Sequence, residues 1–279
     1  MNPALQRIRQ ILPPAVWGGA REAWYGLQRS AEWPAAALHP WRRASLRRLA
    51  AFKDLHKGQR GFIIGNGPSL KRTDLSCLQG EFTFGMNRIY LAFPELGFHT
   101  TYYLSVNTLV IEQCAAEIQA LQMPKFLSWR SRHALLSGRS TVVPGLPEDL
   151  IFLHTTYSGP RFARDARSRL WEGATVTYVA LQLAFHMGFE QVILVGVDHN
   201  FTTTGKPNST VVSQGEDRDH FHHAYFGKGF RWQLPDLQTS ERAYRMAHAA
   251  YLQAGRRVLD ATIGGRLDVF PKVEYERLF

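Results

Sequence analysis

The sequence has few cysteines. Its 279 residues include only Cys77 and Cys114, which stand 37 positions apart with no CxxC pair and no Cys/His spacing of the zinc-binding type. This scarcity argues against a disulfide scaffold and a structural zinc site, and it fits a reducing compartment.

Long apolar runs are also absent. No stretch approaches the roughly 18 to 20 uninterrupted apolar residues that a membrane-spanning helix needs, and the N-terminal residues form no compact apolar signal region. We therefore expect a cytoplasmic protein. Its apolar content of 45% is enough to fill the core of one large globular domain.

Acidic residues are scarce in the first 50 positions, which hold eight arginines but only Glu22 and Glu32. This segment therefore carries +6 of the chain's net charge of +10, and apolar residues recur in it at helical spacing. It also holds four of the seven tryptophans, Trp17, Trp24, Trp33 and Trp41.

Two interpretations of this segment remain open. A basic, Trp-rich amphipathic helix can lie on an anionic membrane, which would place the protein at the inner face of the membrane. Alternatively, the helices pack on the main domain or on a second subunit, so a homo-oligomer stays open. We expect an N-terminal amphipathic helical extension (1–50), a catalytic domain (51–279) and no nucleic-acid partner.

From about residue 52, short apolar segments alternate with helical patterns. This alternation predicts an α/β fold, a Rossmann-like and mostly parallel sheet with helices on both faces. Clear helices are expected from Thr177 to Met187 and from Ser240 to Ala254, each ended by a glycine. The expected strands are Phe62–Ile64, Phe82–Met86, Tyr102–Val106, Lys125–Trp129, Ile151–His154, Gln191–Val197 and Arg257–Ala261.

The first strand runs directly into the turn of GFIIGNGPSL. Gly65 and Gly67 allow the backbone to approach a ligand closely, and their amides, with Asn66 and Ser69, can donate to a phosphate or sugar oxygen. The turn is neither a Walker loop nor a full GxGxxG motif, so the pattern is also compatible with a plain turn.

Two further strand ends carry polar residues. FTFGMNRIY ends in Asn87 and Arg88, an amide that can bind a base or sugar and a guanidinium that can pair with phosphate. VILVGVDHNF ends in Asp198, His199 and Asn200, and polar groups after a buried strand indicate a site or well-paired groups. Because carboxyl ends of parallel strands meet at one edge, we expect these residues to line one site.

A polar, Gly-rich segment from Thr202 to Asp219 is long for a plain connection and is a candidate lid. It leads into DHFHHAYFGKGFRW, where His220, His222 or His223 could act as general base toward an acceptor hydroxyl. Tyr225 is a candidate for stabilising a departing phosphate. The spacing of HFHH lacks a regular metal-binding pair, so we expect no metal site.

The helix after EGATVTY offers a further anion site. Thr175 or Thr177 can cap its first turn, whose unpaired amides and positive dipole end suit a phosphate. Neither cysteine has a motif for nucleophilic catalysis, and no GxSxG elbow is present.

Several blocks in one order resemble a known family. GNGPSL, FGMNRIY, TVTYVALQLAFHMGFEQVILVGVDHNF, HFHHAYFGKGFRW and ATIGGRLDVFP resemble the bacterial branch of the 6-hydroxymethylpterin diphosphokinase MptE-like domain family, over residues 55–279. The same layout is similar to that of metal-independent bacterial sialyltransferases and motility-associated flagellin glycosyltransferases.

The resemblance implies a nucleotide-sugar transferase with a Rossmann-like fold. Asn66 and Asn87 match the two asparagines that hold the CMP-sugar in the sialyltransferases, and the HFHH segment matches the one that supplies their histidine base. Asn200 stands where those enzymes have a tyrosine for the leaving phosphate, which is a departure from their pattern.

The family's archaeal members imply an alternative, the ATP-dependent transfer of pyrophosphate to a pterin. That chemistry needs carboxylates to hold Mg²⁺. Ser105 and Asn107 stand where those acids would be, which favours a metal-independent reaction.

We therefore predict a metal-independent glycosyltransferase that passes a sugar from a nucleotide donor, a CMP-activated acidic sugar, to a glycan or glycolipid hydroxyl. It would need no cofactor besides this donor. Asp198 would orient the histidine base or a donor hydroxyl. A non-catalytic nucleotide-binding or scaffold protein remains the alternative of another class.

Overall fold

The computed structural model describes residues 36–135, 145–157 and 159–279, together with Pro13, Val16, Leu27 and Pro34. Most of the expected N-terminal extension lies outside these residues. The α-helices are α3 (Pro40–Phe52), α4 (Phe93–Leu96), α5 (Thr108–Gln113), α6 (Ala115–Ala120), α7 (Val176–Met187) and α8 (Leu237–Gln253). Short 3-10 turns are η1 (Pro68–Arg72), η2 (Leu75–Leu78), η3 (Ile89–Ala92), η4 (Trp129–Ser131) and η5 (Tyr275–Leu278).

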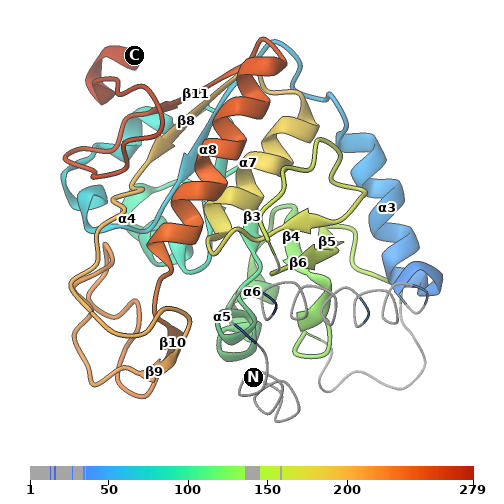
Figure 1. Cartoon of the computed structure of the whole chain (residues 1–279), viewed down its shortest axis with the longest axis horizontal. Helices are drawn as coiled ribbons and strands as arrows, with labels where there is room; N and C mark the ends of the chain where they lie inside the picture. The colour runs from blue at the N-terminus through green and yellow to red at the C-terminus, as the bar shows by residue number, and fades with distance from the viewer. Residues whose placement is uncertain are drawn as a thin grey trace.

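A seven-stranded parallel sheet forms the centre of the molecule (Figure 1). Its strands are β1 (Arg60–Ile64), β2 (Thr83–Met86), β3 (Tyr102–Ser105), β4 (Lys125–Ser128), β5 (Leu150–Leu153), β8 (Gln191–Val195) and β11 (Arg257–Asp260). Two small sheets pair β6 (Thr155–Thr156) with β7 (Leu170–Trp171), and β9 (Thr210–Val212) with β10 (Arg231–Gln233). The Rossmann-like prediction is confirmed, including all seven strands of the main sheet.

The strand order is β11-β8-β1-β2-β3-β4-β5, and every neighbouring pair is parallel. The chain builds the sheet outward from β1 to β5, then returns to add β8 on the other side of β1. The direction of winding therefore reverses between β1 and β8. In open parallel sheets, a crevice for ligands lies at the carboxyl ends of the strands where this reversal occurs.

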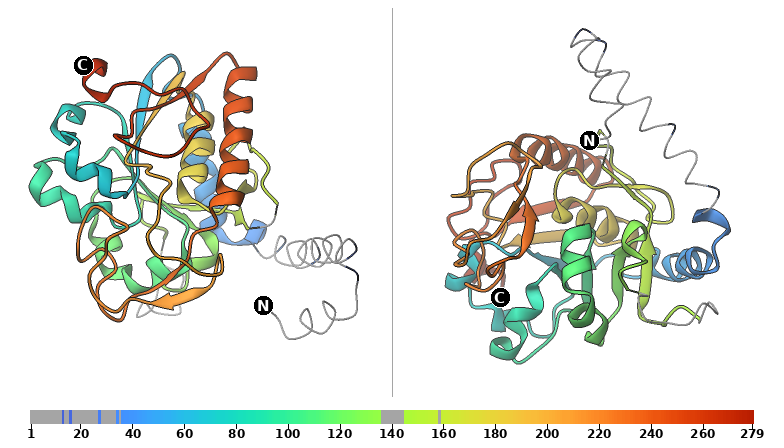
Figure 2. Two further views of the ribbon diagram at one scale, coloured as in Figure 1. Left: turned by 60° about the vertical axis from the view of Figure 1, so that its left-hand side comes forward. Right: turned by 90° about the horizontal axis from the view of Figure 1, so that it is seen from below.

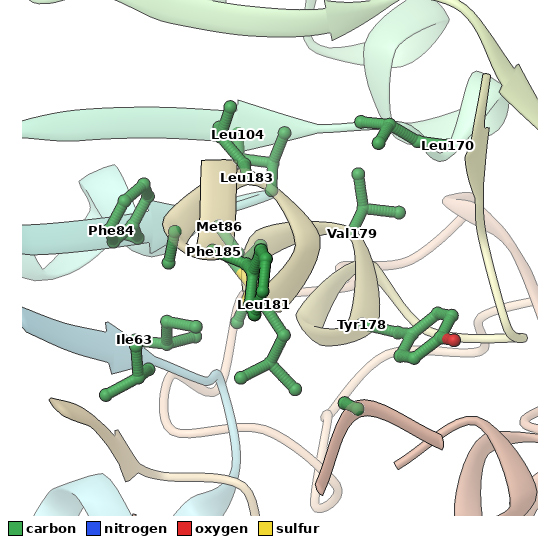
Figure 3. Close-up of a cluster of buried hydrophobic side chains, with 14 of the residues drawn as sticks. Ile63, Phe84, Met86, Leu104, Leu170, Tyr178, Val179, Leu181, Leu183 and Phe185 are labelled. Atoms are coloured by element: carbon green, nitrogen blue, oxygen red, sulfur yellow. The ribbon is translucent and has the colours of Figure 1, made fainter. Parts of the chain in front are cut away.

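Helix α7 packs on one face of the sheet and contributes eight residues to the buried cluster there. Leu181 and Leu183 belong to the same buried cluster as Ile63, Phe84 and Leu104 of β1, β2 and β3 (Figure 3). All residues of α7 after its first are buried, which explains why its sequence is apolar on nearly every side. This packing fixes the N-terminal end of α7 relative to the strand ends.

The opposite face is covered by shorter helices. Phe62, Ile64 and Tyr103 lie in a second buried cluster with apolar residues of η1, η2, α4, α5 and α6. Helices therefore cover both faces, as the left view of Figure 2 shows. Side chains of β1 alternate between the two clusters, as the period of a strand requires.

Helix α3 protects the edge strand β5. The Phe152 amide donates to Ser45 Oγ at 2.9 Å, and an Arg42 Nη donates to the Phe152 carbonyl at 2.9 Å. Trp41 is buried and stacks on Phe152 with centroids 6.4 Å apart. These contacts satisfy edge groups that could otherwise pair with another chain. Helix α3 crosses the expected boundary at residue 50, so its start belongs to the sheet domain.

None of the helices in the described ranges is long and apolar enough to cross a membrane.

A long connection between β8 and α8 carries the antiparallel β9–β10 hairpin. We call residues 201–234 the lid segment; it forms a lobe beside the sheet domain (Figure 1, lower left). The hairpin docks on α5, where the side-chain amide of Gln113 accepts from the Arg231 amide at 2.9 Å and donates to its carbonyl at 2.8 Å. The lid segment is thus held against α5, the helix that follows β3.

Candidate functional site

A cavity lies at the carboxyl edge of the sheet, where the turns after β1 and β8 meet. It holds about 720 Å³ of empty space, its open mouth included. Its walls come from the turns after β1, β2 and β8, from the starts of α7 and α8, and from the lid segment. The predicted residues among its lining are Gly65, Asn66, Gly67, Asn87, Thr175, Thr177, Asp198, Asn200, His220 and Tyr225.

The β1 and β8 turns approach each other so closely that only glycine fits. A Cβ on Gly65 would lie 2.1 Å from the Gly196 carbonyl oxygen, and one on Gly67 would lie 1.9 Å from Asp198 Oδ2. The Gly65 amide donates to Val195 O at 2.7 Å, and the Gly67 amide donates to Gly196 O at 2.9 Å. The predicted donation of these two amides to a ligand is therefore wrong, because β8 and its turn already accept from both.

The Asp198 carboxylate accepts two hydrogen bonds from Ser69. The Ser69 amide donates to Oδ1 at 3.1 Å and the hydroxyl donates to Oδ2 at 2.6 Å. Burial raises the pKa of Asp198, and the bonds from Ser69 oppose this effect. Ser69 therefore holds Asp198 rather than a ligand phosphate, and Asp198 orients the β1 turn rather than a histidine.

Asn66 combines a fixed amide group with an unsatisfied oxygen. Its Nδ2 donates to Met86 O at 3.1 Å, and its backbone carbonyl accepts from the Phe221 amide of the lid segment at 2.9 Å. Its Oδ1 is buried and has no hydrogen-bond partner in the described part of the chain. A buried acceptor without a donor costs free energy, which indicates that a ligand or a water completes this site.

Asn87 has a left-handed backbone, with φ of +51°. Asparagine tolerates this conformation better than most residues, which explains an Asn at this strand end. Its Oδ1 accepts from Ser105 Oγ at 2.9 Å, and its carbonyl accepts from the Tyr103 hydroxyl at 2.6 Å. The side chain is thus held in one orientation at the floor of the cavity.

Arg88 lies outside the cavity lining and binds the lid segment. Its guanidinium donates to the carbonyls of Ala224, at 3.0 Å, and of Tyr225. It also lies over the ring of Phe230, 5.3 Å from its centroid. The predicted pairing of Arg88 with a phosphate is therefore not what its side chain does here; it fastens the lid segment to the sheet.

His220 is the histidine of the HFHH cluster that lines the cavity. Its Nδ1 lies 2.8 and 3.0 Å from the two Asp217 carboxylate oxygens. Because an ionised carboxylate only accepts, Nδ1 donates, and Nε2 of the neutral ring keeps a lone pair. The amides of Asp219 and Phe226 donate to Asp217 at 2.9 and 3.1 Å, which fixes the carboxylate. This arrangement suits a general base.

Tyr225 supports His220 from one side. The two rings are nearly parallel, and Tyr225 is 1% exposed. Burial raises the pKa of the Tyr225 hydroxyl, so it stays protonated, and the Arg88 amide donates to it at 3.4 Å. The ring thus positions the histidine, while the predicted contact of the hydroxyl with a departing phosphate stays a prediction.

His222 and His223 do not line the cavity. Nδ1 of His222 accepts from the Ala224 amide at 3.1 Å, and the ring stacks on His223, which is exposed. Of the three histidines offered by the sequence, the geometry therefore selects His220. Lys228 and Arg231 also lie outside the lining.

Asp219 pins the start of the lid segment. Its two carboxylate oxygens accept from the hydroxyls of Thr202 and Thr203 at 2.8 and 2.6 Å, and from both backbone amides. Burial by itself would raise the pKa of Asp219, but these hydrogen bonds outweigh burial and lower it. The Asp219 carboxylate therefore joins Thr202 and Thr203 to the part of the lid segment directly before His220.

The start of α7 forms another wall. Thr175 is its N-cap, with Oγ1 accepting from the Thr177 amide at 3.3 Å, as the sequence predicted. Thr175 Oγ1 also lies 3.3 Å from the Tyr244 hydroxyl of α8. Thr177 is buried, and Asn200 is exposed at the rim.

Cationic side chains are missing from this lining. Among the described residues that form it, none is Lys or Arg, whereas Asp198 and Asp219 contribute carboxylates. Within the described ranges, no three His, Cys, Asp or Glu side chains gather as a metal site would require. The start of α7 offers an anion the positive end of a helix dipole.

Asp217, which supports His220, and Tyr244 of the lining were not predicted as site residues, whereas His199 was one of the strand-end residues expected to line the site. Asp217 lies three residues before His220, and an acid at that spacing was the available signal. Tyr244 had no signal, because only the fold brings α8 beside α7.

No family model and no curated protein matches the chain. Among solved structures it is similar to the MAf glycosyltransferase from Magnetospirillum magneticum AMB-1, with 15% sequence identity and a TM-score of 0.49. The similarity covers 87% of this chain and 40% of that longer one.

Proposed function

We propose that the chain is a glycosyltransferase that moves a sugar from a nucleotide donor to a hydroxyl of a glycan or glycolipid acceptor. The observation that carries this proposal is the His220–Asp217 pair, with Nδ1 bound to the carboxylate and Nε2 left for a proton. A base so placed can deprotonate a hydroxyl as it attacks the anomeric carbon. The pair lies at the sheet edge where nucleotides bind in related architectures.

The donor we propose is CMP-activated, with an acidic sugar. The described lining offers no Lys or Arg, so the start of α7 would hold the single phosphate of this donor. Asn66 and Asn87 would bind the nucleoside.

The pterin pyrophosphokinase is the alternative enzyme. Its Mg²⁺ would need carboxylate ligands beside the phosphates. Both oxygens of Asp198 already accept from Ser69, and those of Asp219 from Thr202 and Thr203. Asn107 caps α5 through the amides of Leu109 and Val110. These contacts favour the transferase.

Replacement of each histidine by glutamine tests the proposal. With CMP-, UDP- and GDP-sugars as donors, we expect His220→Gln to lower donor turnover by about 10²-fold or more. His222→Gln and His223→Gln serve as matched controls and should stay within a few-fold of the unmodified chain. Equal turnover in all three variants would exclude His220 as the base.

The basic N-terminal segment is proposed to hold the enzyme at an anionic membrane surface. In α3, Trp41 is buried, and Arg42 and Arg48 donate to carbonyls of the sheet domain, so these residues serve packing. Arg43 and Arg47 are exposed. Flotation of the full chain with phosphatidylserine-containing vesicles, but not with phosphatidylcholine vesicles, is the expected result. No difference between the two would remove this proposal.

A further inference from the structure

His199 lies in the cavity wall directly after Asp198. Its backbone is left-handed, with φ of +53°, a conformation that is uncommon outside glycine and asparagine. Residues held in such conformations cluster at functional sites. Its side chain lines the cavity, and neither ring nitrogen has a hydrogen-bond partner among the described residues.

Tyr244 stands beside His199 on the same wall. The two ring centroids are 6.2 Å apart, and the Tyr244 hydroxyl lies 3.3 Å from Thr175 Oγ1. Because Thr175 Oγ1 accepts from the Thr177 amide, its own proton can go to Tyr244, and the phenol proton is then available to a ligand. Burial raises the pKa of Tyr244, so the phenol remains a donor.

We infer that His199 and Tyr244 bind the phosphate of the nucleotide donor and stabilise it as it leaves; this inference rests on the proposed function. His199 and His220 are the described lining side chains that can become cationic. His220 is already bound to the Asp217 carboxylate, which leaves His199 for an anionic ligand. The N-terminal end of α7 adds its dipole on the same wall.

In the proposed transfer, His220 acts on the acceptor hydroxyl and His199 acts on the leaving phosphate. The acceptor oxygen bonds to the anomeric carbon while the hydroxyl proton passes to His220 Nε2. The bond from that carbon to the phosphate oxygen breaks, and its electron pair stays on the phosphate. A ring N–H of His199 and the Tyr244 hydroxyl donate hydrogen bonds to this phosphate.

The charged groups around His199 mean that proton uptake on ligand binding can be measured as a second test of this inference. Burial lowers the pKa of His199, Glu241 of α8 raises it, and Lys272 lowers it again. Asp198 precedes it in the chain, and the neutral Tyr244 faces its ring. A phosphate in contact with the ring favours the imidazolium, so binding should take up protons near neutral pH.

The test compares nucleoside monophosphates with their nucleosides by titration calorimetry. The probes are CMP, UMP, AMP and GMP, each with its nucleoside, against the full chain and its variants. His199→Asn keeps a residue that tolerates the left-handed backbone, and Tyr244→Phe removes one hydroxyl. His223→Asn is the control, since His223 is exposed and outside the cavity.

We expect His199→Asn to weaken binding of the preferred monophosphate by about tenfold or more, and Tyr244→Phe by a smaller factor. Nucleoside binding should stay unchanged, and proton uptake, measured in buffers of different ionisation enthalpy, should disappear in His199→Asn. Full phosphate preference in His199→Asn would overturn this inference and leave the proposed function standing. Absence of any phosphate preference in the unmodified chain would overturn both.

Discussion

The imidazole of His220 lies flat on the ring of Tyr225, with centroids 4.0 Å apart and planes inclined by 7°. Together with Asp217, this contact restrains the ring in two directions: the carboxylate fixes rotation through Nδ1, and the phenol ring fixes the plane. A base restrained in this way keeps Nε2 at one position while the acceptor approaches.

The stack predicts different results for two substitutions of Tyr225. Tyr225→Phe keeps the flat ring and should lower donor turnover only a few-fold. Tyr225→Leu removes the face on which His220 rests and should lower kcat by about tenfold or more, because a misplaced base loses much of its effect. Steady-state turnover with the preferred nucleotide sugar measures both variants.

A chemical role for the Tyr225 hydroxyl predicts the reverse order. If Tyr225→Phe lost as much turnover as Tyr225→Leu, the hydroxyl would act on the phosphate and the stack would be secondary. Chemical denaturation of each variant separates either outcome from a loss of folding, since a ring this deeply buried also contributes to stability.

Position 67 requires a glycine because the Asp198 carboxylate leaves no room for a side chain, and not because of the backbone conformation. Its φ of −72° and ψ of 161° suit any residue, but an added Cβ would lie 1.9 Å from Asp198 Oδ2. Gly67→Ala should therefore displace Asp198 from Ser69 and lower the free energy of unfolding by about 1–3 kcal/mol. Urea denaturation is the measurement.

Two further variants check the cause. Gly145→Ala, whose Cβ would meet no atom within 4 Å, should leave the free energy of unfolding unchanged. In an Asp198→Ala background, Gly67→Ala should cost at least about 1 kcal/mol less than it does alone, because the clashing carboxylate is gone. Strictly additive costs would contradict the contact.

Much of the fold could be predicted because its signals are local. Each strand of the main sheet is a short apolar run, and Gly188 after α7 takes the left-handed conformation, with φ of +92°, that ends a helix. The convergence of Asn66, Asn87 and Asp198 also followed from local evidence, since parallel strands bring their carboxyl ends to one edge.

The side-chain roles could not be predicted, because they depend on pairs distant in sequence. Ser69 and Asp198 are 129 positions apart, and their hydrogen bonds remove both from the ligand-binding set. The choice of His220 over its neighbours depends on the path of the lid backbone, and Arg88 turns toward that segment instead of the cavity. No sequence pattern indicates which partners these side chains contact.

Asn66 is expected to show opposite effects on stability and binding. Asn66→Ala loses the hydrogen bond to Met86 O but also removes the buried, unpartnered Oδ1. These two effects nearly offset, so the free energy of unfolding should change by less than about 1 kcal/mol. Binding of CMP should fall by about tenfold or more, because the ligand loses its acceptor. Calorimetry and denaturation together measure the contrast.

Asn87→Ala provides the matched control. Asn87 has satisfied partners and a left-handed backbone, so its replacement should destabilise the fold by about 1–2 kcal/mol as well as weaken binding. Equal destabilisation by Asn66→Ala would mean that Oδ1 is satisfied in the free protein, and its assignment to a ligand would then fail.

His154, after β5, makes the stability of the fold depend on pH. Burial and then the charges of Arg42, Arg169 and Arg130 lower its pKa from 6.5 to about 4. Between these values the unfolded chain binds a proton that the folded chain does not bind, so acidification favours unfolding. The stabilisation is present above pH 6.5 and is lost as the pH falls toward 4.

His154→Gln should remove this dependence. Because the side chain is only half-buried, we expect the unmodified chain to lose about 2 kcal/mol more than the variant between pH 7 and pH 4. Denaturant titrations across this range measure the difference, with His223→Gln as the exposed control. If the curves of the unmodified chain and His154→Gln stayed parallel, His154 would bind its proton in the folded state, and the three arginines would be too distant or too well hydrated to oppose it.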